Sequence, residues 1–183
     1  MKTIVALVFT ILSMVCMSQA ERIESSKLDS LIWKKINEYR VSKGAEPFRV
    51  FEDSLMRKFS TRVAYRNIGK QLTSHSDSVG YWNNAECLYT LTSSGSGNSP
   101  IIKEIYQANY EYLAEKTVQS WIHSPKHERA ISRPDYDVAT IVSIIIVDPK
   151  NNEIRLDATY HALDKNHTTF NGYVYPVTKK GNR

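Results

Sequence analysis

Apolar residues recur at helical spacing in three segments of the chain. The first segment follows Ser25-Ser26, a pair suited to cap a helix, and has apolar positions at Leu28, Leu31, Ile32, Ile36 and Tyr39. Because Gly44 is a natural C-terminal stop, this pattern predicts an amphipathic helix over about 28–44.

Two further helices are predicted downstream. Asp53 is a suitable cap for a helix with apolar positions at Leu55, Met56, Phe59, Val63 and Ala64. A third helix is predicted over 101–123, and Pro125 ends it because proline cannot continue a helix. The segments 69–84 and 93–100 have no regular period, and we interpret them as loops within one domain.

A two-stranded hairpin is predicted nearer the C-terminus. Residues 138–147 are rich in β-branched side chains, which indicates a strand buried on both faces. After a turn at 148–152, residues 154–163 alternate as a returning strand, and 174–177 is a short edge piece. Because helices precede the hairpin without βαβ alternation, the pattern predicts an α+β sandwich rather than a doubly wound sheet.

The first twenty residues have the pattern of a secretory signal peptide. A positive residue precedes an apolar run at 4–15, and small residues stand where a signal peptidase would cleave after Ala20. The run is shorter than the ~20 residues of a transmembrane helix, and the residues before Cys16 are not those expected ahead of a lipidated cysteine. We therefore expect cleavage after Ala20, a single domain at 21–183, a secreted or periplasmic location and no transmembrane anchor.

The composition is that of an ordinary globular domain, and it bears on which kinds of partner the protein can bind. Of 183 residues, 42% are hydrophobic and 23% charged, and the net charge is +5. This mild basic excess indicates weak attraction to anionic surfaces, and no aromatics interleave with a basic run, so we expect no nucleic-acid partner. After cleavage Cys87 is the one cysteine left, so no internal disulfide can form, and its apolar neighbours favour a buried inert thiol over a reactive one.

Candidate chemistry is limited to histidines and one carboxylate in an apolar context. Glu86 lies among apolar neighbours, where a buried charge needs a cationic, metallic or hydrogen-bonding partner that a loop histidine could supply. His123 and His127 have the four-residue spacing of two helical metal ligands, but Pro125 between them breaks the helix. The sequence contains no Gly-rich phosphate loop, G-x-S-x-G elbow, H-E-x-x-H or paired-cysteine zinc pattern.

The order of several short motifs resembles that of the CAP superfamily, the cysteine-rich secretory, antigen-5 and pathogenesis-related proteins. The chain has Asn37-Glu38-Tyr39-Arg40 where the family has Asn-x-x-Arg, and Asp53-Ser54-Leu55 resembles the family's D-x-x-L. Ser74-His75 resembles its S-H pair, and Ala85-Glu86-Cys87-Leu88 resembles its G-E-N-I. The bacterial W-x-x-S-P-x-H-R segment is similar to Trp121-Ile122-His123-Ser124-Pro125-Lys126-His127-Glu128-Arg129. The resemblance covers about 28–163. Cys87 stands where the family has Asn, and the family's second Glu has no counterpart that we can place. The lack of disulfides indicates the disulfide-poor bacterial branch.

The resemblance implies an α-β-α sandwich with a central antiparallel sheet and a cleft. It places His75, Glu86 and His127 together in that cleft, and two imidazoles with a carboxylate form a set that accepts zinc or another divalent cation. The same three side chains without metal would be a polar network that joins two loops to the core. The remaining histidines are expected outside this cluster: His123, His161 and His167.

The function that the resemblance implies is a non-enzymatic extracellular binding module for a lipid, glycan or protein ligand. Two alternatives stay open. One is a metal-dependent hydrolase, such as a peptidase, with Glu86 as ligand or base. The other is a cell-envelope structural protein with an inert cleft. No nucleophile is paired with a base at a recognisable spacing, which favours the binding module.

Overall fold

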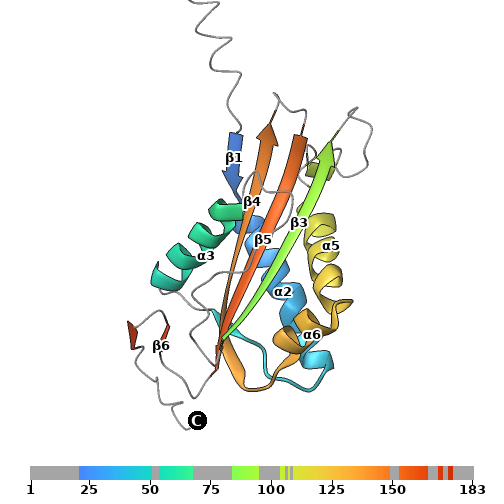
Figure 1. Cartoon of the computed structure of the whole chain (residues 1–183). Helices are drawn as coiled ribbons and strands as arrows, with labels where there is room; N and C mark the ends of the chain where they lie inside the picture. Colours follow the sequence, from blue (N-terminus) through green and yellow to red (C-terminus); the bar gives the residue numbers. More distant parts are fainter. Residues whose placement is uncertain are drawn as a thin grey trace, which may run out of the picture.

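A central, mostly antiparallel sheet with helices on both faces makes up the described part of the chain (Figure 1). The computed structural model describes residues 21–50, 54–67, 84–94, 104–105, 107, 109–148, 153–164, 169–170 and 173–174. The predicted signal peptide, most of the predicted loops and the turn after residue 148 lie outside these residues. Within the described residues, no helix is long and apolar enough to cross a membrane.

The sheet has the strand order β1-β4-β5-β3, and β2 pairs in parallel with β4. Its strands are β1 (Glu21–Glu24), β2 (Arg49–Val50), β3 (Asn84–Ser94), β4 (Tyr136–Asp148) and β5 (Glu153–Asp164). The predicted hairpin is confirmed, since β4 pairs with β5 along its whole length.

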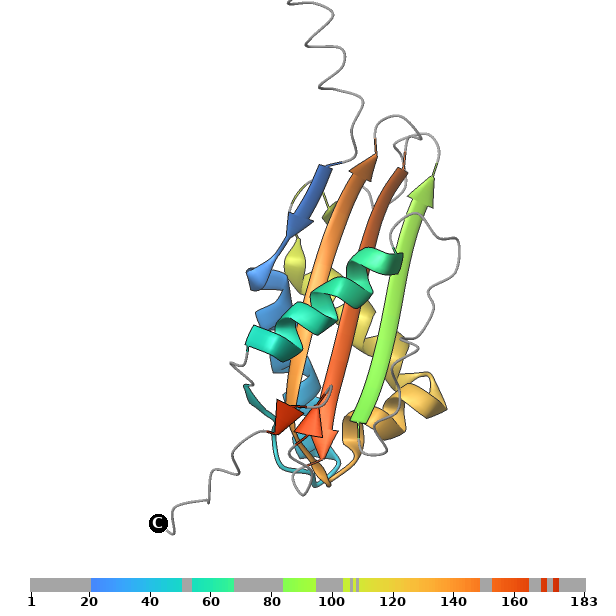
Figure 2. The ribbon, with the colours of Figure 1, turned by 60° about the vertical axis from the view of Figure 1, so that its left-hand side comes forward.

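Helices cover the two faces of the sheet unequally. One face is crossed by α3 (Ser54–Asn67), and the other is covered by α2 (Ser26–Ser42), α5 (Tyr110–Ile122) and α6 (Pro125–Ser132). The turned view in Figure 2 shows α3 in front of the strands and the other three helices behind them. The predicted α+β class is confirmed.

Strand alternation explains why both faces of β4 are buried. Ile141 and Ile145 belong to the large core that includes residues of α2 and α5. Val142 and Ile144, one position out of phase, pack with Ala64 of α3 in a smaller cluster. Because successive side chains of a strand point to opposite faces, the apolar run predicted from the sequence serves two separate cores.

The helix ends follow from their capping residues. The Ser25 hydroxyl accepts the N–H of Leu28 at 3.2 Å and starts α2. Gly44, just beyond α2, has a φ of +76°, a backbone conformation that suits glycine. The predicted helix over 101–123 is too long, because α5 begins after the cap Asn109. Pro125 does more than end that helix, since it occupies the first turn of α6, where its missing N–H costs nothing.

Four strands, β1, β2, β3 and β6 (Thr169–Phe170), lie outside the sequence prediction. β1 and β2 have four and two residues, too few to show a period. β3 alternates apolar and polar residues as a strand does, but its many polar residues make this pattern hard to recognise from the sequence. In a second, small sheet, β6 pairs with β7 (Tyr173–Val174), which overlaps the predicted edge piece at Val174.

Candidate functional site

A chain of three buried polar side chains joins α3 to the sheet. The Ser60 hydroxyl oxygen lies 2.8 Å from Nδ1 of His161, and Nε2 of His161 lies 2.7 Å from Oε2 of Glu86. Ser60 is 0% exposed and His161 2% exposed, and the side chain of Glu86 is 7% exposed. The ring of Phe59 packs edge-on against the imidazole, with centroids 5.1 Å apart. This Ser60–His161–Glu86 chain is the candidate site.

The register of two strands brings the members of this chain together. Glu86 of β3 lies directly opposite His161 of β5, and directly opposed side chains on one face have their Cβ atoms about 5 Å apart. Along β5 the residues at 155, 157, 159 and 161 are polar, and those between them are apolar. The apolar set belongs to the large core, so the polar set faces α3.

The protonation pattern of the site follows from its donors and acceptors. An ionised carboxylate only accepts hydrogen bonds, so with Glu86 ionised Nε2 of His161 is the donor in this contact. Nδ1 then accepts from the Ser60 hydroxyl while the imidazole is neutral. In a hydrolytic Ser-His-Asp triad the serine pairs with Nε2 and the acid with Nδ1. The two nitrogens have exchanged partners here.

A second buried polar group lies on the same face of the sheet. Thr90 faces Asp157 in the register of β3 and β5, and its hydroxyl donates to Oδ1 of Asp157 at 2.7 Å. Nε of Arg155 donates to the same carboxylate oxygen at 2.9 Å. Arg155 and Asp157 are both nearly inaccessible to solvent. Buried charges of this kind are stable only when paired, so this face of the sheet holds two groups of paired, buried polar side chains.

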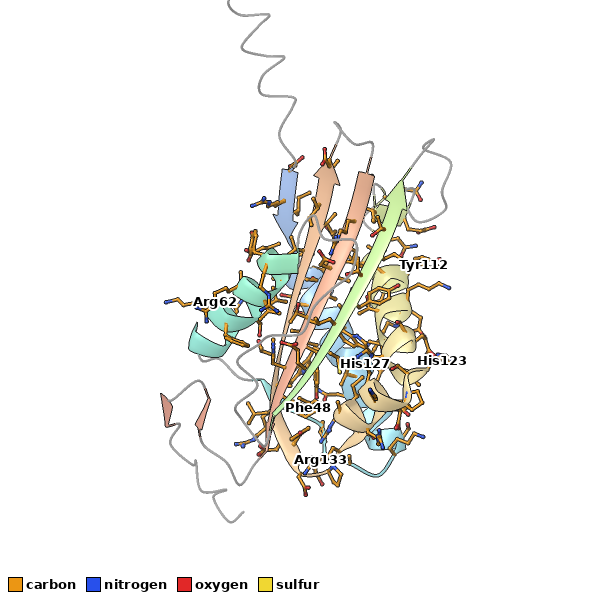
Figure 3. The ribbon with its side chains drawn as sticks, in the orientation of Figure 1. Phe48, Arg62, Tyr112, His123, His127 and Arg133 are labelled. Atoms are coloured by element: carbon orange, nitrogen blue, oxygen red, sulfur yellow. The ribbon has the colours of Figure 1, made fainter. Side chains whose placement is uncertain are left out.

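The structure describes two of the residues expected to share a cleft. Glu86 points to the α3 face, and Cys87, the next residue, points to the opposite face, where its Sγ lies 4.0 Å from the backbone oxygen of His127. Figure 3 shows His127 on the α5 and α6 side of the sheet, away from Arg62 on α3. The Glu86 side chain and the His127 backbone thus belong to opposite sides of the sheet, and the convergence of the two side chains in one cleft stays a prediction.

His161 is the main correction to the sequence analysis. It was expected outside the cluster, but it is a partner of Glu86. Glu86 has a partner, as predicted, and His161 on the neighbouring strand is one such partner. His123 caps α5, away from this chain, with Nδ1 2.7 Å from the oxygen of Gln119. His75 and His167 lie outside the described residues.

The described residues supply only part of a zinc site. Nε2 of His161 and Oε2 of Glu86 are one nitrogen and one oxygen donor 2.7 Å apart, whereas zinc in proteins takes at least three protein ligands. Among the described residues, no three His, Cys, Asp or Glu side chains are grouped for a metal ion.

Cys87 lies in the core, as predicted. It is 0% exposed, and burial raises the pKa of its thiol far above the ordinary value. Because the thiolate is the reactive species, burial disfavours the reactive form of Cys87.

The first motif of the resemblance anchors two loops. Nε and both terminal nitrogens of Arg40 donate to backbone oxygens beyond α2, those of Glu46, Ile131, Arg133 and Tyr136. Arg40 is 0% exposed, and its guanidinium carbon lies 3.6 Å from the ring centroid of Phe48. Asn37 completes the arrangement, since its side-chain oxygen accepts the N–H of Phe48 at 2.8 Å. The Asn-x-x-Arg spacing therefore has a structural role.

The comparisons with known proteins assign no family. The chain matches no protein-family model and no curated protein. Among solved structures it is similar to an outer surface protein from Borrelia burgdorferi, with 13% sequence identity and a TM-score of 0.46. The similarity covers 80% of this chain and 99% of that one.

Proposed function

We propose that the protein is an exported, CAP-like binding module without hydrolytic activity. The observation that carries this proposal is the burial of the Ser60–His161–Glu86 chain, whose members are 0, 2 and 7% exposed. A catalytic nucleophile must come within bonding distance of a substrate atom. Ser60 has no exposed surface through which a substrate could approach. The hydrogen bonds of these three side chains instead hold α3 against the sheet.

The geometry of the histidine gives a second reason. In a hydrolytic triad the acid on Nδ1 orients the imidazole so that Nε2 can take the proton of the serine. Here Glu86 occupies Nε2 and Ser60 occupies Nδ1. A histidine that contacts a carboxylate through one nitrogen can still polarise a serine hydroxyl at the other. Because Ser60 is buried, however, no substrate can reach that hydroxyl.

The CAP-like assignment is supported by the roles of its motif residues. Arg40 and Asn37 join the first helix to the segments that precede α3 and follow α6. A motif at this spacing is expected where one helix must organise two distant loops. The α+β arrangement, with one helix on one sheet face and three on the other, is compatible with the sandwich that the resemblance implies.

Export is supported by the position of β1. The proposed cleavage after Ala20 would leave Glu21 as the first residue, and β1 begins at Glu21, which pairs with Val147. Cleavage would therefore remove the apolar leader and leave every described residue of the sheet in place.

Two measurements test the proposal. The first is N-terminal sequencing of the exported protein, which should begin at Glu21. The second is hydrolysis of ester and peptide substrates by the chain from Glu21, with and without added zinc, compared with Ser60→Ala and Glu86→Gln. We expect all three proteins to show the same background rate. Turnover by the wild type that either substitution abolishes would overturn the proposal.

A further inference from the structure

The outer face of α3 carries positive charge without acidic residues. Its fourteen residues, Ser54–Asn67, include no Asp or Glu and four basic side chains, Arg57, Lys58, Arg62 and Arg66. On α2 of the opposite layer, by contrast, Lys34 pairs with Glu38, and Lys35 pairs with Glu111 and Glu115. The charge on α3 is therefore a local feature, beyond the mild excess of the whole chain.

Three exposed basic side chains lie on α3 and on the neighbouring strand β1. Lys58 and Arg62 are four residues apart on the solvent side of the helix, and both are exposed. Arg22 of β1 is also exposed, and its guanidinium carbon lies 5.5 Å from the ring centroid of Tyr65, three residues after Arg62. Figure 3 shows Arg62 pointing away from the sheet. We call Arg22, Lys58 and Arg62 the α3 cationic face.

Two acidic side chains near α3, Asp29 and Glu24, have partners other than Arg22, Lys58 and Arg62, although Glu24 keeps its charge. Asp29 accepts hydrogen bonds from Arg57 and from Ser143, and Glu24 accepts the hydroxyl of Tyr65 at 3.0 Å. No ion pair joins Arg22, Lys58 or Arg62 to a carboxylate within the described part of the chain. The three cations are free to meet an external anion.

We propose that the α3 cationic face binds the surface of an anionic phospholipid membrane. A helix on the outside of a sheet presents a convex row of side chains, which suits a broad surface better than an enclosed ligand. Basic side chains on such a helix are attracted to anionic headgroups, and guanidiniums pair with phosphate oxygens in two parallel hydrogen bonds. Exported proteins meet such surfaces, so this inference rests on the proposed export and names a partner for the binding module.

The test is co-sedimentation of the chain from Glu21 with vesicles. Vesicles of phosphatidylcholine with phosphatidylglycerol are compared with phosphatidylcholine alone, at low and high salt. Each basic residue near an anionic surface contributes about a fivefold change in partitioning. The triple variant Arg22→Gln, Lys58→Gln, Arg62→Gln should therefore lose about a hundredfold. Because screening weakens exposed charges, high salt should abolish wild-type binding.

A matched control separates this face from net charge. The triple variant Lys34→Gln, Lys126→Gln, Arg129→Gln removes the same charge from exposed positions on α2 and α6. It should retain most of the binding. Lys58→Gln alone, with an expected loss of about fivefold, serves if the first triple variant does not fold.

Three outcomes would overturn the inference. They are no sedimentation of the wild type with the anionic vesicles at low salt, equal losses in the two triple variants, and tighter binding to duplex DNA than to vesicles under the same conditions. None of these results bears on hydrolysis. Failure of the membrane inference is therefore distinguishable from failure of the proposed function.

Discussion

The carboxylate of Asp29 on α2 accepts both the backbone N–H and the hydroxyl of Ser143 on β4, at 2.7 and 2.6 Å. This contact fills a gap at the edge of the sheet, because β1 pairs with residues 144–147 of β4 and β2 with 138–139. Arg57 of α3 donates to Asp29 at 3.0 Å from the other side. One carboxylate thus joins both helix layers to the sheet.

Replacement of Asp29 should change how stability depends on pH. Burial raises the pKa of Asp29 above its ordinary value, although hydrogen bonds from Ser143 and Arg57 oppose the rise. The folded state therefore binds the proton more tightly than the unfolded chain, so this group's contribution is present at acid pH and is lost as pH rises through the raised pKa. Relative to Asp29→Asn, the wild type should gain free energy of unfolding as pH falls from neutrality towards 3.8. Urea unfolding of both proteins across that range checks it, and a constant difference would contradict it.

Arg40 should be among the most costly residues to replace. Arg40→Met would leave four backbone oxygens without their buried donor, and we expect a loss of about 3–5 kcal/mol in the free energy of unfolding. Arg40→Lys keeps the charge but cannot reach all four oxygens, so it should recover only part of the loss. The control Lys34→Met, at a side chain 69% exposed, should change stability by no more than about 0.5 kcal/mol. Guanidinium unfolding measures all three, and a small effect of Arg40→Met would refute the anchoring role.

The thiol of Cys87 should be inert in the folded protein. It is buried, and its pKa is raised far above the ordinary value by burial. In the chain from Glu21, a thiol-exchange reagent at mildly alkaline pH should give no signal until denaturant is added. Rapid stoichiometric reaction of the native protein would show that the core around Cys87 opens readily.

Replacement of His161 and replacement of His127 should have different effects on zinc binding. His127 belongs to α6, on the sheet face opposite α3, so we predict that His127→Ala leaves the calorimetric zinc titration the same as that of the wild type. His161→Gln removes a nitrogen 2.7 Å from the Glu86 carboxylate and should weaken zinc binding at that carboxylate. Loss of zinc affinity on removal of His127 alone would support the site expected from the sequence.

The sequence predicts those parts of the fold that have a long, regular period. The helix over 26–42, the helix over 54–67 and the β4–β5 hairpin all follow from spacing and capping. β1 and β2 are too short to carry a signal, and they exist because β4 offers an edge for them.

The candidate site was only half predictable for a similar reason. The apolar neighbours of Glu86 correctly indicate that its carboxylate needs a partner. The identity of that partner depends on strand register, since Glu86 meets His161 across two strands separated by some seventy residues of chain. His161 occupies a polar position of the alternating strand, and this was the one signal in the sequence that could have placed it beside Glu86.

The central claim is that the Ser60–His161–Glu86 chain is a sealed structural element rather than a catalytic triad. Its most direct test is labelling of the native chain from Glu21 with a fluorophosphonate, which modifies activated serines, followed by peptide mass spectrometry. The account predicts no adduct on Ser60 in the folded protein, together with a loss of about 1–3 kcal/mol of stability in Ser60→Ala, because that substitution leaves a nitrogen of buried His161 without its partner. An adduct on Ser60 that disappears in His161→Gln would contradict the account.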